Sequence, residues 1–379
     1  MKRAVSKLPS YKTAGVLVAI VAVLVVLILI FTPLVQSTVF DLIFSPFQKK
    51  VPASVTFEVE RGFAVSANGG SIINFTLDVP MIPDIDSEGK QLQRVLDVSY
   101  YPAPTSLTPR YGIDWAVWQH GGLSGEESHR VRMVYQIKTE AMLWNLGSSL
   151  SGNLSDLPDS LTNRYLHDEW KIIVNDPRIQ TNATNIVKGE TNVYLILSAI
   201  NSWMVDHVGY PSETELADPS TSVQTLESMI GDCDDQAILF CALARASGVP
   251  AWLQLGASYD ITGHEWVGHG WVQTYVPLKS GSGEKVTIDT VNRDFMIWKP
   301  NRFAEFTDDG NGDHLYDYYS LFSCAYDSSS YIAGEGPEFI GEYDSISYTE
   351  SQEKIVIDDF FQLTCQGLVD RELASVKRS

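Results

Sequence analysis

The chain of 379 residues has few cysteines and, outside its first 50 residues, few basic side chains. Four cysteines are too few for a disulfide scaffold, and no two of them form a C-x-x-C pair. Six of the 27 lysines and arginines lie in residues 1–50, which leaves 21 basic against 46 acidic residues in the remainder. Phosphate backbones repel such an acidic body, so we expect no nucleic-acid partner.

An apolar run without any charge fills residues 14–34. As a helix it would be roughly 30 Å long, the thickness of a bilayer core, whereas the apolar part of a cleaved signal peptide has only about 7–15 residues. Four basic residues precede the run, and this bias places the N-terminus on the cytoplasmic side. The sequence therefore predicts a cytoplasmic N-terminus (1–13), one transmembrane helix (14–36) in the cell membrane, and an extracytoplasmic body.

An extracytoplasmic position changes how two kinds of residue are interpreted. The Asn-x-Ser/Thr triplets that begin at Asn74, Asn153 and Asn182 become acceptors for glycosylation. Cys324 and Cys365 become candidates for a disulfide, because such bonds persist outside the cytoplasm. The sequence shows neither the use of the triplets nor the distance between the two cysteines.

Strand patterns dominate residues 52–146. Apolar and polar residues alternate at 55–60 and again at 130–138, and glycine and proline pairs separate the runs as turns. Strands with one apolar face close most simply by packing two sheets together. We therefore predict a β-sandwich-like domain over 52–146.

Helical patterns come first in residues 163–330, and strand patterns follow. Apolar residues recur at helical spacing in 191–207, and a second helix begins at 232 and is apolar on every side from 237 to 244. Strands are expected at 251–255, 266–276 and 285–291. This order predicts an α+β domain over 163–330, with 331–379 as a C-terminal extension.

Cys233 lies in the first turn of the second helix, where the partial positive charge of the helix end favours a thiolate. Asp232, Asp234 and Asp235 act the other way, so a nucleophilic thiol here needs a nearby cation such as an imidazolium. A cysteine that opens a helix is more often a small buried residue, as Cys241 is in the same helix.

Two histidines follow, and their spacing excludes one common site. His264 and His269 are five residues apart, one more than the H-E-x-x-H zinc motif allows, and glycines around them oppose a helix. His269 instead falls in a strand pattern, and a hairpin loop over 277–281 would place it opposite Asp289 on the next strand. Such an aspartate can orient the imidazole, so Cys233, His269 and Asp289 form a candidate catalytic triad.

These residues lie in segments that resemble a known family. The stretch 231–252 looks like the core motif of the transglutaminase-like superfamily, His269-Gly-Trp271 is similar to its His-x-Trp strand, and Ile288-Asp289-Thr290 to its Asp strand. The resemblance covers about 165–300 and is closest to microbial members. It implies a papain-like core in which Cys233 is the nucleophile, His269 the general base and then acid, and Asp289 the residue that orients it.

An acidic stretch suggests one cofactor. Asp309, Asn311 and Asp313 place oxygen ligands at alternate positions, as calcium loops do. The stretch is not an EF-hand, because His314 stands where glycine belongs and Ser320 where the bidentate glutamate would be. A solvated acidic turn is the more common form of such a stretch, so calcium is a candidate and no cofactor is required.

The sequence as a whole predicts a membrane-anchored extracytoplasmic thiol enzyme. It would act on amide bonds of peptides or proteins through a Cys233 thioester, as a peptidase or amidase or by transfer of the acyl group to an amine. Two alternatives remain: a catalytically idle transglutaminase-like module that binds partners or organises the envelope, and a calcium-dependent adhesin or structural ectodomain. The substrate, the acyl acceptor and the oligomeric state are open.

Overall fold

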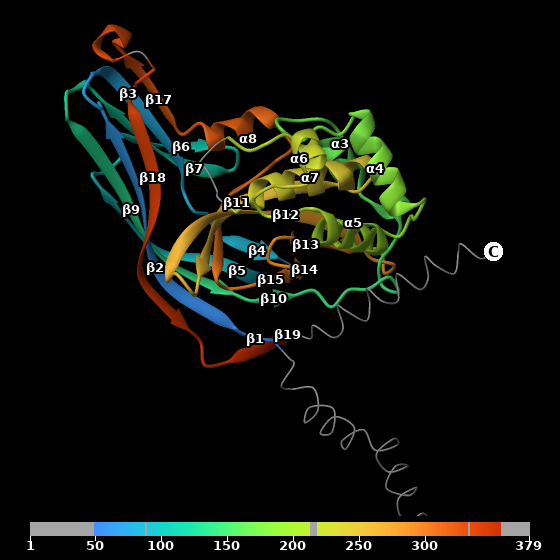
Figure 1. Cartoon of the computed structure of the whole chain (residues 1–379). Helices are drawn as coiled ribbons and strands as arrows, with labels where there is room; N and C mark the ends of the chain where they lie inside the picture. The colour runs from blue at the N-terminus through green and yellow to red at the C-terminus, as the bar shows by residue number, and fades with distance from the viewer. Residues whose placement is uncertain (1–48, 88, 213–217, 333, 358–379) are drawn as a thin grey trace, which may run out of the picture. The chain divides into compact units, whose positions relative to one another are not determined.

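The computed structural model describes residues 49–87, 89–212, 218–332 and 334–357 (Figure 1). The predicted transmembrane segment 14–36 lies outside the described residues, and so does Cys365. None of the helices described is both long and apolar enough to cross a membrane. By its internal contacts the chain divides into two units, Val51–Ile355 with Thr364–Ser379 and Met1–Lys50 with Val356–Leu363. The sheets and helices that form the site belong to the first unit.

Two antiparallel sheets form the β-rich region, as predicted for the N-terminal part. One has the strand order β18-β2-β9-β5-β4, and the other has β17-β3-β7-β6 with β8 also on β3. Alternate residues of β2, such as Val55, Phe57 and Val59, are fully buried and enter a core shared with the second sheet. The strands are β2 (Ser54–Ser66), β3 (Ser71–Pro80), β4 (Ile85–Ser87), β5 (Lys90–Tyr101), β6 (Ser106–Arg110), β7 (Ile113–His120), β8 (Leu123–Ser124), β9 (Ser128–Glu140), β17 (Phe322–Tyr326) and β18 (Glu338–Glu350).

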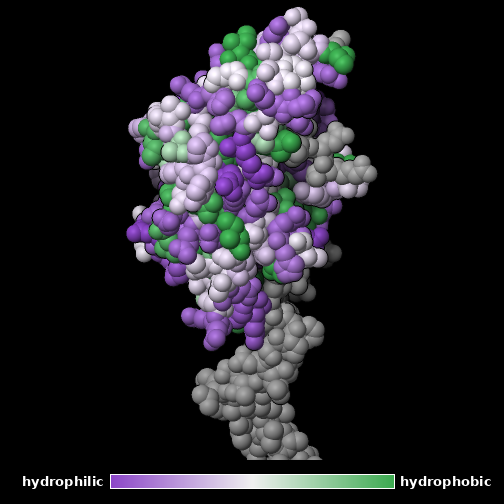
Figure 2. Space-filling model, turned by 90° about the vertical axis from the view of Figure 1, so that its left-hand side faces the viewer, coloured by the Kyte–Doolittle hydropathy of each residue, from purple (hydrophilic) through white to green (hydrophobic). Residues whose placement is uncertain are grey.

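The expected division of the chain at residue 330 is not the one that the structure has. β17 pairs with β3, and β18 pairs with β2 along its whole length, so the segment predicted as an extension completes the β-rich region. The side of the molecule that carries β18 and β9 shows hydrophilic and hydrophobic residues interspersed (Figure 2). Arg130 of β9 forms ion pairs there with Glu342 and Asp344 of β18. A strand this polar lacks the apolar alternation by which strands are found in a sequence.

A five-stranded antiparallel sheet of order β14-β13-β12-β11-β16 carries the candidate site, with helices packed against it. Its strands are β11 (Ala251–Asp260), β12 (Glu265–Pro277), β13 (Gly283–Asp289), β14 (Asp294–Phe295) and β16 (Arg302–Thr307). The helices are α3 (Asp159–Tyr165), α4 (Pro177–Val187), α5 (Val193–His207), α6 (Ser222–Ser228), α7 (Cys233–Ala246) and α8 (Gly312–Tyr319). Shorter elements are β1 (Lys49–Pro52), β10 (Met142–Leu143), β15 (Ile297–Trp298), β19 (Lys354–Ile357), η2 (Leu154–Asp156) and η3 (Ser328–Ser330).

Helix α7 is the central element between the sheet and the other helices (Figure 1). The Asp232 side chain caps its N-terminus by accepting the Asp235 N–H, and Gly248 turns the chain after its last residue with a φ of +84°. Residues 237–244 are all at most 4% exposed, because β11 and β12 cover one side of the helix and α4, α5 and α6 cover the other. This burial fixes the position of the first turn, where Cys233 lies.

Candidate active site

Cys233 is the first residue of α7, and only 8% of it is exposed. Its sulfur donates to the Asp234 Oδ1 at 3.1 Å. The Tyr319 hydroxyl, at the end of α8, donates to the other oxygen of the same carboxylate at 2.8 Å. Asp234 is therefore held between the thiol and a partly buried tyrosine.

The surroundings of the thiol favour its protonated form. Burial raises the pKa of the Cys233 thiol well above its ordinary value, the charge of Asp234 raises it further, and Asp232 adds to the effect. The Gly270 N–H, which lies against the sulfur, acts in the opposite direction. Burial and the neighbouring acidic residues together thus outweigh the Gly270 N–H and raise the pKa of the thiol.

His269 of β12 and Asp289 at the end of β13 are joined by a hydrogen bond between Nε2 and Oδ2 of 2.8 Å. The hairpin that connects them differs from the predicted one by two positions. Val272 pairs with Ile288. In this register the residue opposite Asp289 is Trp271, whereas the sequence predicted His269 there. A shift of two residues keeps a side chain on the same face of a sheet, so the two side chains still meet.

Asn292 completes the contacts of this pair. Its backbone N–H donates to the Asp289 Oδ1 at 3.1 Å, and its side-chain amide lies 2.9 Å from the Asp289 Oδ2 and 3.1 Å from the His269 Nε2. Sequence analysis missed this residue, although an asparagine three positions after an aspartate in a turn is a local signal that such contacts form.

Arg302 of β16 lies beneath the His269–Asp289 pair and is fully buried. Its guanidinium is 3.0 Å from the Asp289 Oδ2 and 3.1 Å from the Asp294 Oδ2, and it lies over the ring of Trp271. Burial by itself would raise the pKa of Asp289, but the charges of His269 and Arg302 outweigh it and hold that pKa far below its usual range. Nothing near Arg302 in the sequence indicates this role, because Arg302 comes close to Asp289 only when β16 pairs with β11 in the sheet.

The structure brings the thiol to the backbone on both sides of His269. The Cys233 sulfur is 3.9 Å from the Gly268 carbonyl oxygen and faces the Gly270 N–H. Within the described residues, no hydrogen bond joins the sulfur to the imidazole, whose Nε2 is hydrogen-bonded to Asp289 and lies beside the Asn292 amide. The remaining nitrogen, Nδ1, has no hydrogen-bond partner among the described residues. Such contacts are often long in the absence of a substrate.

Tyr210 is a further residue near the thiol that sequence analysis did not select as a site residue. It follows α5 in the chain, and its side chain is half exposed. Burial first, and then the charge of Cys233, raises the pKa of its hydroxyl to about 12, together with the carboxylates around the thiol. Tyr210 therefore remains a neutral hydroxyl group beside the thiol at physiological pH.

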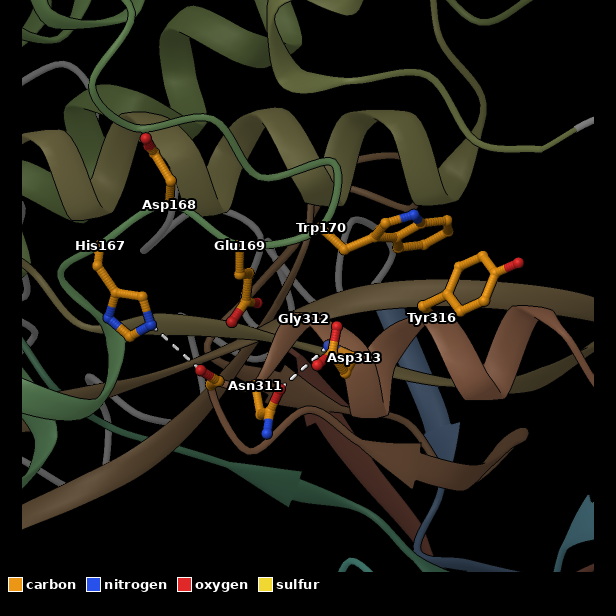
Figure 3. A pocket seen from close by; sticks show the side chains of 9 residues that line it. His167, Asp168, Glu169, Trp170, Asn311, Gly312, Asp313 and Tyr316 are labelled. Atoms are coloured by element: carbon orange, nitrogen blue, oxygen red, sulfur yellow. Dashed lines mark hydrogen bonds between the residues drawn. The ribbon is translucent and has the colours of Figure 1, made fainter.

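Two of the three candidate calcium ligands have other partners in the structure. The Asp309 carboxylate is 3.0 Å from the His314 Nδ1, and the Asn311 side-chain oxygen caps α8 by accepting the Asp313 N–H. The chain near them forms part of a pocket of about 550 Å³ between residues 167–170 and 310–316. Figure 3 shows the Glu169 carboxyl group and the Trp170 and Tyr316 rings on its walls. None of its lining residues belongs to the triad.

A helix that begins with a cysteine, packed on a sheet that carries a histidine and an aspartate, is the arrangement of papain-like thiol enzymes. Residues 180–283, which include Cys233 and His269, match the model of the transglutaminase-like superfamily. The chain therefore contains a domain of this superfamily. No curated protein matches the chain.

Solved structures resemble the chain beyond this segment. A candidate cysteine protease from Cytophaga hutchinsonii is 15% identical, with 82% of this chain and 93% of that chain covered and a TM-score of 0.52, which shows a common fold. The periplasmic domain of TgpA from Pseudomonas aeruginosa is 12% identical over 64% of this chain and 88% of that chain, with a TM-score of 0.32. LapG from Legionella pneumophila is 17% identical over 38% of this chain and 93% of that chain, with a TM-score of 0.28.

Proposed function

We propose that the protein is a thiol enzyme that acts on amide bonds of peptides or proteins through a thioester on Cys233. The observation that carries the proposal is the position of the Cys233 sulfur, 3.9 Å from the carbonyl oxygen of the residue before His269, while His269 itself is held by Asp289 at 2.8 Å. A nucleophile, a base and a residue that orients the base thus lie within one turn of helix and two adjoining strands.

The reaction follows from the roles of these atoms. His269 takes the proton of the Cys233 thiol, and the sulfur attacks the carbonyl carbon of the amide. The C–N bond then breaks, and the amine leaves with the proton that His269 returns. Water attacks the thioester to release an acid, or a second amine attacks it to form a new amide, and in both cases the thiol is restored.

Arg302 bears on how the imidazole works. Because Arg302 compensates the charge of Asp289, the carboxylate stays ionised and accepts the hydrogen bond from His269 Nε2. This bond selects the tautomer with the proton on Nε2, which leaves Nδ1 free as the base. Nothing in this arrangement requires a metal ion.

A second function is favoured by a different observation. The thiol donates to Asp234, and its pKa is raised instead of lowered. A site that stays in this state would suit a catalytically idle binding module. The two functions differ in whether the imidazole can draw the proton from the sulfur.

The experiment that separates them is the rate of Cys233 alkylation by iodoacetamide against pH, in the full chain and in His269→Ala. If the protein is an enzyme, Cys233 reacts at pH values below those at which a free thiol ionises, and this reactivity is lost in His269→Ala. Equal profiles in the two proteins would contradict the proposal. Cys233→Ala identifies the background from the other cysteines.

We also infer a location for this activity from the sequence. The uncharged run at 14–34 and the basic residues ahead of it support an anchor in the cell membrane with the site on the extracytoplasmic side. Labelling of intact cells with a membrane-impermeant maleimide tests this, using one cysteine placed at exposed Ser280 in a chain whose native cysteines, Cys233, Cys241, Cys324 and Cys365, are all replaced by alanine. Labelling only after lysis would contradict it.

A further inference from the structure

Strand β12 is much longer than its neighbour β13. β12 has 13 residues and β13 has seven, and their pairing covers only residues 272–277 of β12. The preceding part, 265–271, pairs with β11 on one side. On its other side, no strand of the described part of the chain is paired with it. This part of β12 is therefore a sheet edge without a paired strand in the described part of the chain, although β18 also packs near β12.

The outward groups of this edge can be assigned. In an antiparallel ladder, the N–H and C=O of alternate residues point to opposite sides of the strand. The Gly268 C=O and the Gly270 N–H both face the Cys233 sulfur. The residues whose backbone groups point away from β11 are therefore Trp266, Gly268 and Gly270. Within the described residues, the Trp266 backbone groups and the Gly268 N–H form no hydrogen bond on this side.

Space and exposure allow another chain to approach. Gly268 is exposed, Val267 is 50% exposed, and a Cβ added to Gly268 would meet no atom within 4 Å. The sulfur lies on the side of β12 where β13 would continue if it were longer. An added strand would run about 4.8 Å from β12, so its main chain would lead directly to the thiol.

We propose that the β12 edge, residues 265–268, binds the main chain of an extended polypeptide as an additional strand and delivers one of its carbonyl groups to Cys233. Main-chain hydrogen bonds to Trp266 and Gly268 would supply affinity without regard to side chains. The delivery of a carbonyl to the thiol rests on the proposed function, whereas the binding of the main chain does not. A folded protein would have to expose or unfold a segment to use this edge.

The test uses Cys233→Ala full chain, so that binding is measured without catalysis, and fluorescein-labelled casein as an unfolded polypeptide. Gly268→Pro removes the outward N–H without removing a bond to β11, since the Gly268 N–H faces the open edge. Gly268→Ala keeps the N–H and places its methyl group in open space. By fluorescence anisotropy, Gly268→Pro should bind casein about tenfold or more weakly than Gly268→Ala, because a hydrogen bond is lost and the ring obstructs the edge.

A second measurement needs no substitution at Gly268. Hydrogen exchange of Cys233→Ala with and without casein should show slower exchange of the Trp266 and Gly268 amides when casein is bound. Equal affinities of the two variants, or unchanged exchange at both amides, would overturn the proposal. Protection that appears without casein and grows with protein concentration would also overturn it, because a second copy of the chain would then occupy the edge.

Discussion

The two halves of the site are built in opposite ways. On the sheet, Asp289 lies between His269 and Arg302, and each buried carboxylate has a basic partner. At the helix end, the thiol is buried beside carboxylates, and burial together with the charge of Asp234 favours its protonated form. The difference teaches that the imidazole is held in place by compensated charges, whereas the thiol would have to lose its contact with Asp234 before it could ionise easily.

The largest expected effect comes from breaking the preorganised half. In Arg302→Met, a buried guanidinium within 3.1 Å of both Asp289 and Asp294 is lost, and Asp289 keeps only neutral donors and the imidazole. We expect the free energy of unfolding to fall by about 3–5 kcal/mol, as for other broken buried ion pairs. Urea unfolding measures it. Arg132→Met, whose side chain is 43% exposed and pairs with Glu60, should cost less than about 1 kcal/mol.

Acid should weaken the same half. The pKa of Asp289 is depressed in the folded chain, so its contribution to stability is complete above the unfolded value of about 3.9 and is lost as the pH falls from there toward the folded value. Between pH 5 and pH 2.5, wild type should therefore lose roughly 2 kcal/mol more than Asp289→Asn does. Urea unfolding at a series of pH values gives the difference. Parallel curves for the two proteins would show that Asp289 is not held ionised by folding.

How much of this could be predicted depended on whether a signal was local. The Asp cap, the apolar helix after Cys233 and the alternation around His269 are each contained in a few consecutive residues, and α7 and β12 lie where these patterns put them. The contact of Arg302 with Asp289 was not predictable, because it depends on β16 pairing with β11 and not with β13. β18 escaped for a different reason, since its residues alternate little in polarity and its partner β2 is almost 300 positions earlier.

Removing the negative charge of Asp234 should lower the pKa of the Cys233 thiol and so reduce the contrast between the two halves of the site. In Asp234→Asn, the carboxylate that accepts from the Cys233 sulfur and raises its pKa becomes neutral. The rate of alkylation by iodoacetamide at pH 7 should rise roughly three- to tenfold, because more of the thiol is ionised. Asp159→Asn, on the exposed surface of α3, is the matched control and should leave the rate unchanged. A slower reaction in Asp234→Asn would mean that Asp234 assists the thiol and does not restrain it.

The smallest effect should come from Tyr319, which acts on the thiol only through Asp234. Its hydroxyl stabilises the charge of that carboxylate by a 2.8 Å hydrogen bond. In Tyr319→Phe, the Asp234 carboxylate loses one hydrogen-bond donor, so it accepts the thiol proton more strongly. Alkylation at pH 7 should therefore slow by roughly twofold. The sign is opposite to that of Asp234→Asn, which separates an electrostatic effect from a general loosening of the first turn. In Asp234→Asn there is no charge for the hydroxyl to stabilise, so adding Tyr319→Phe should change the rate no further, and a twofold decrease there would place the action of Tyr319 on the thiol itself.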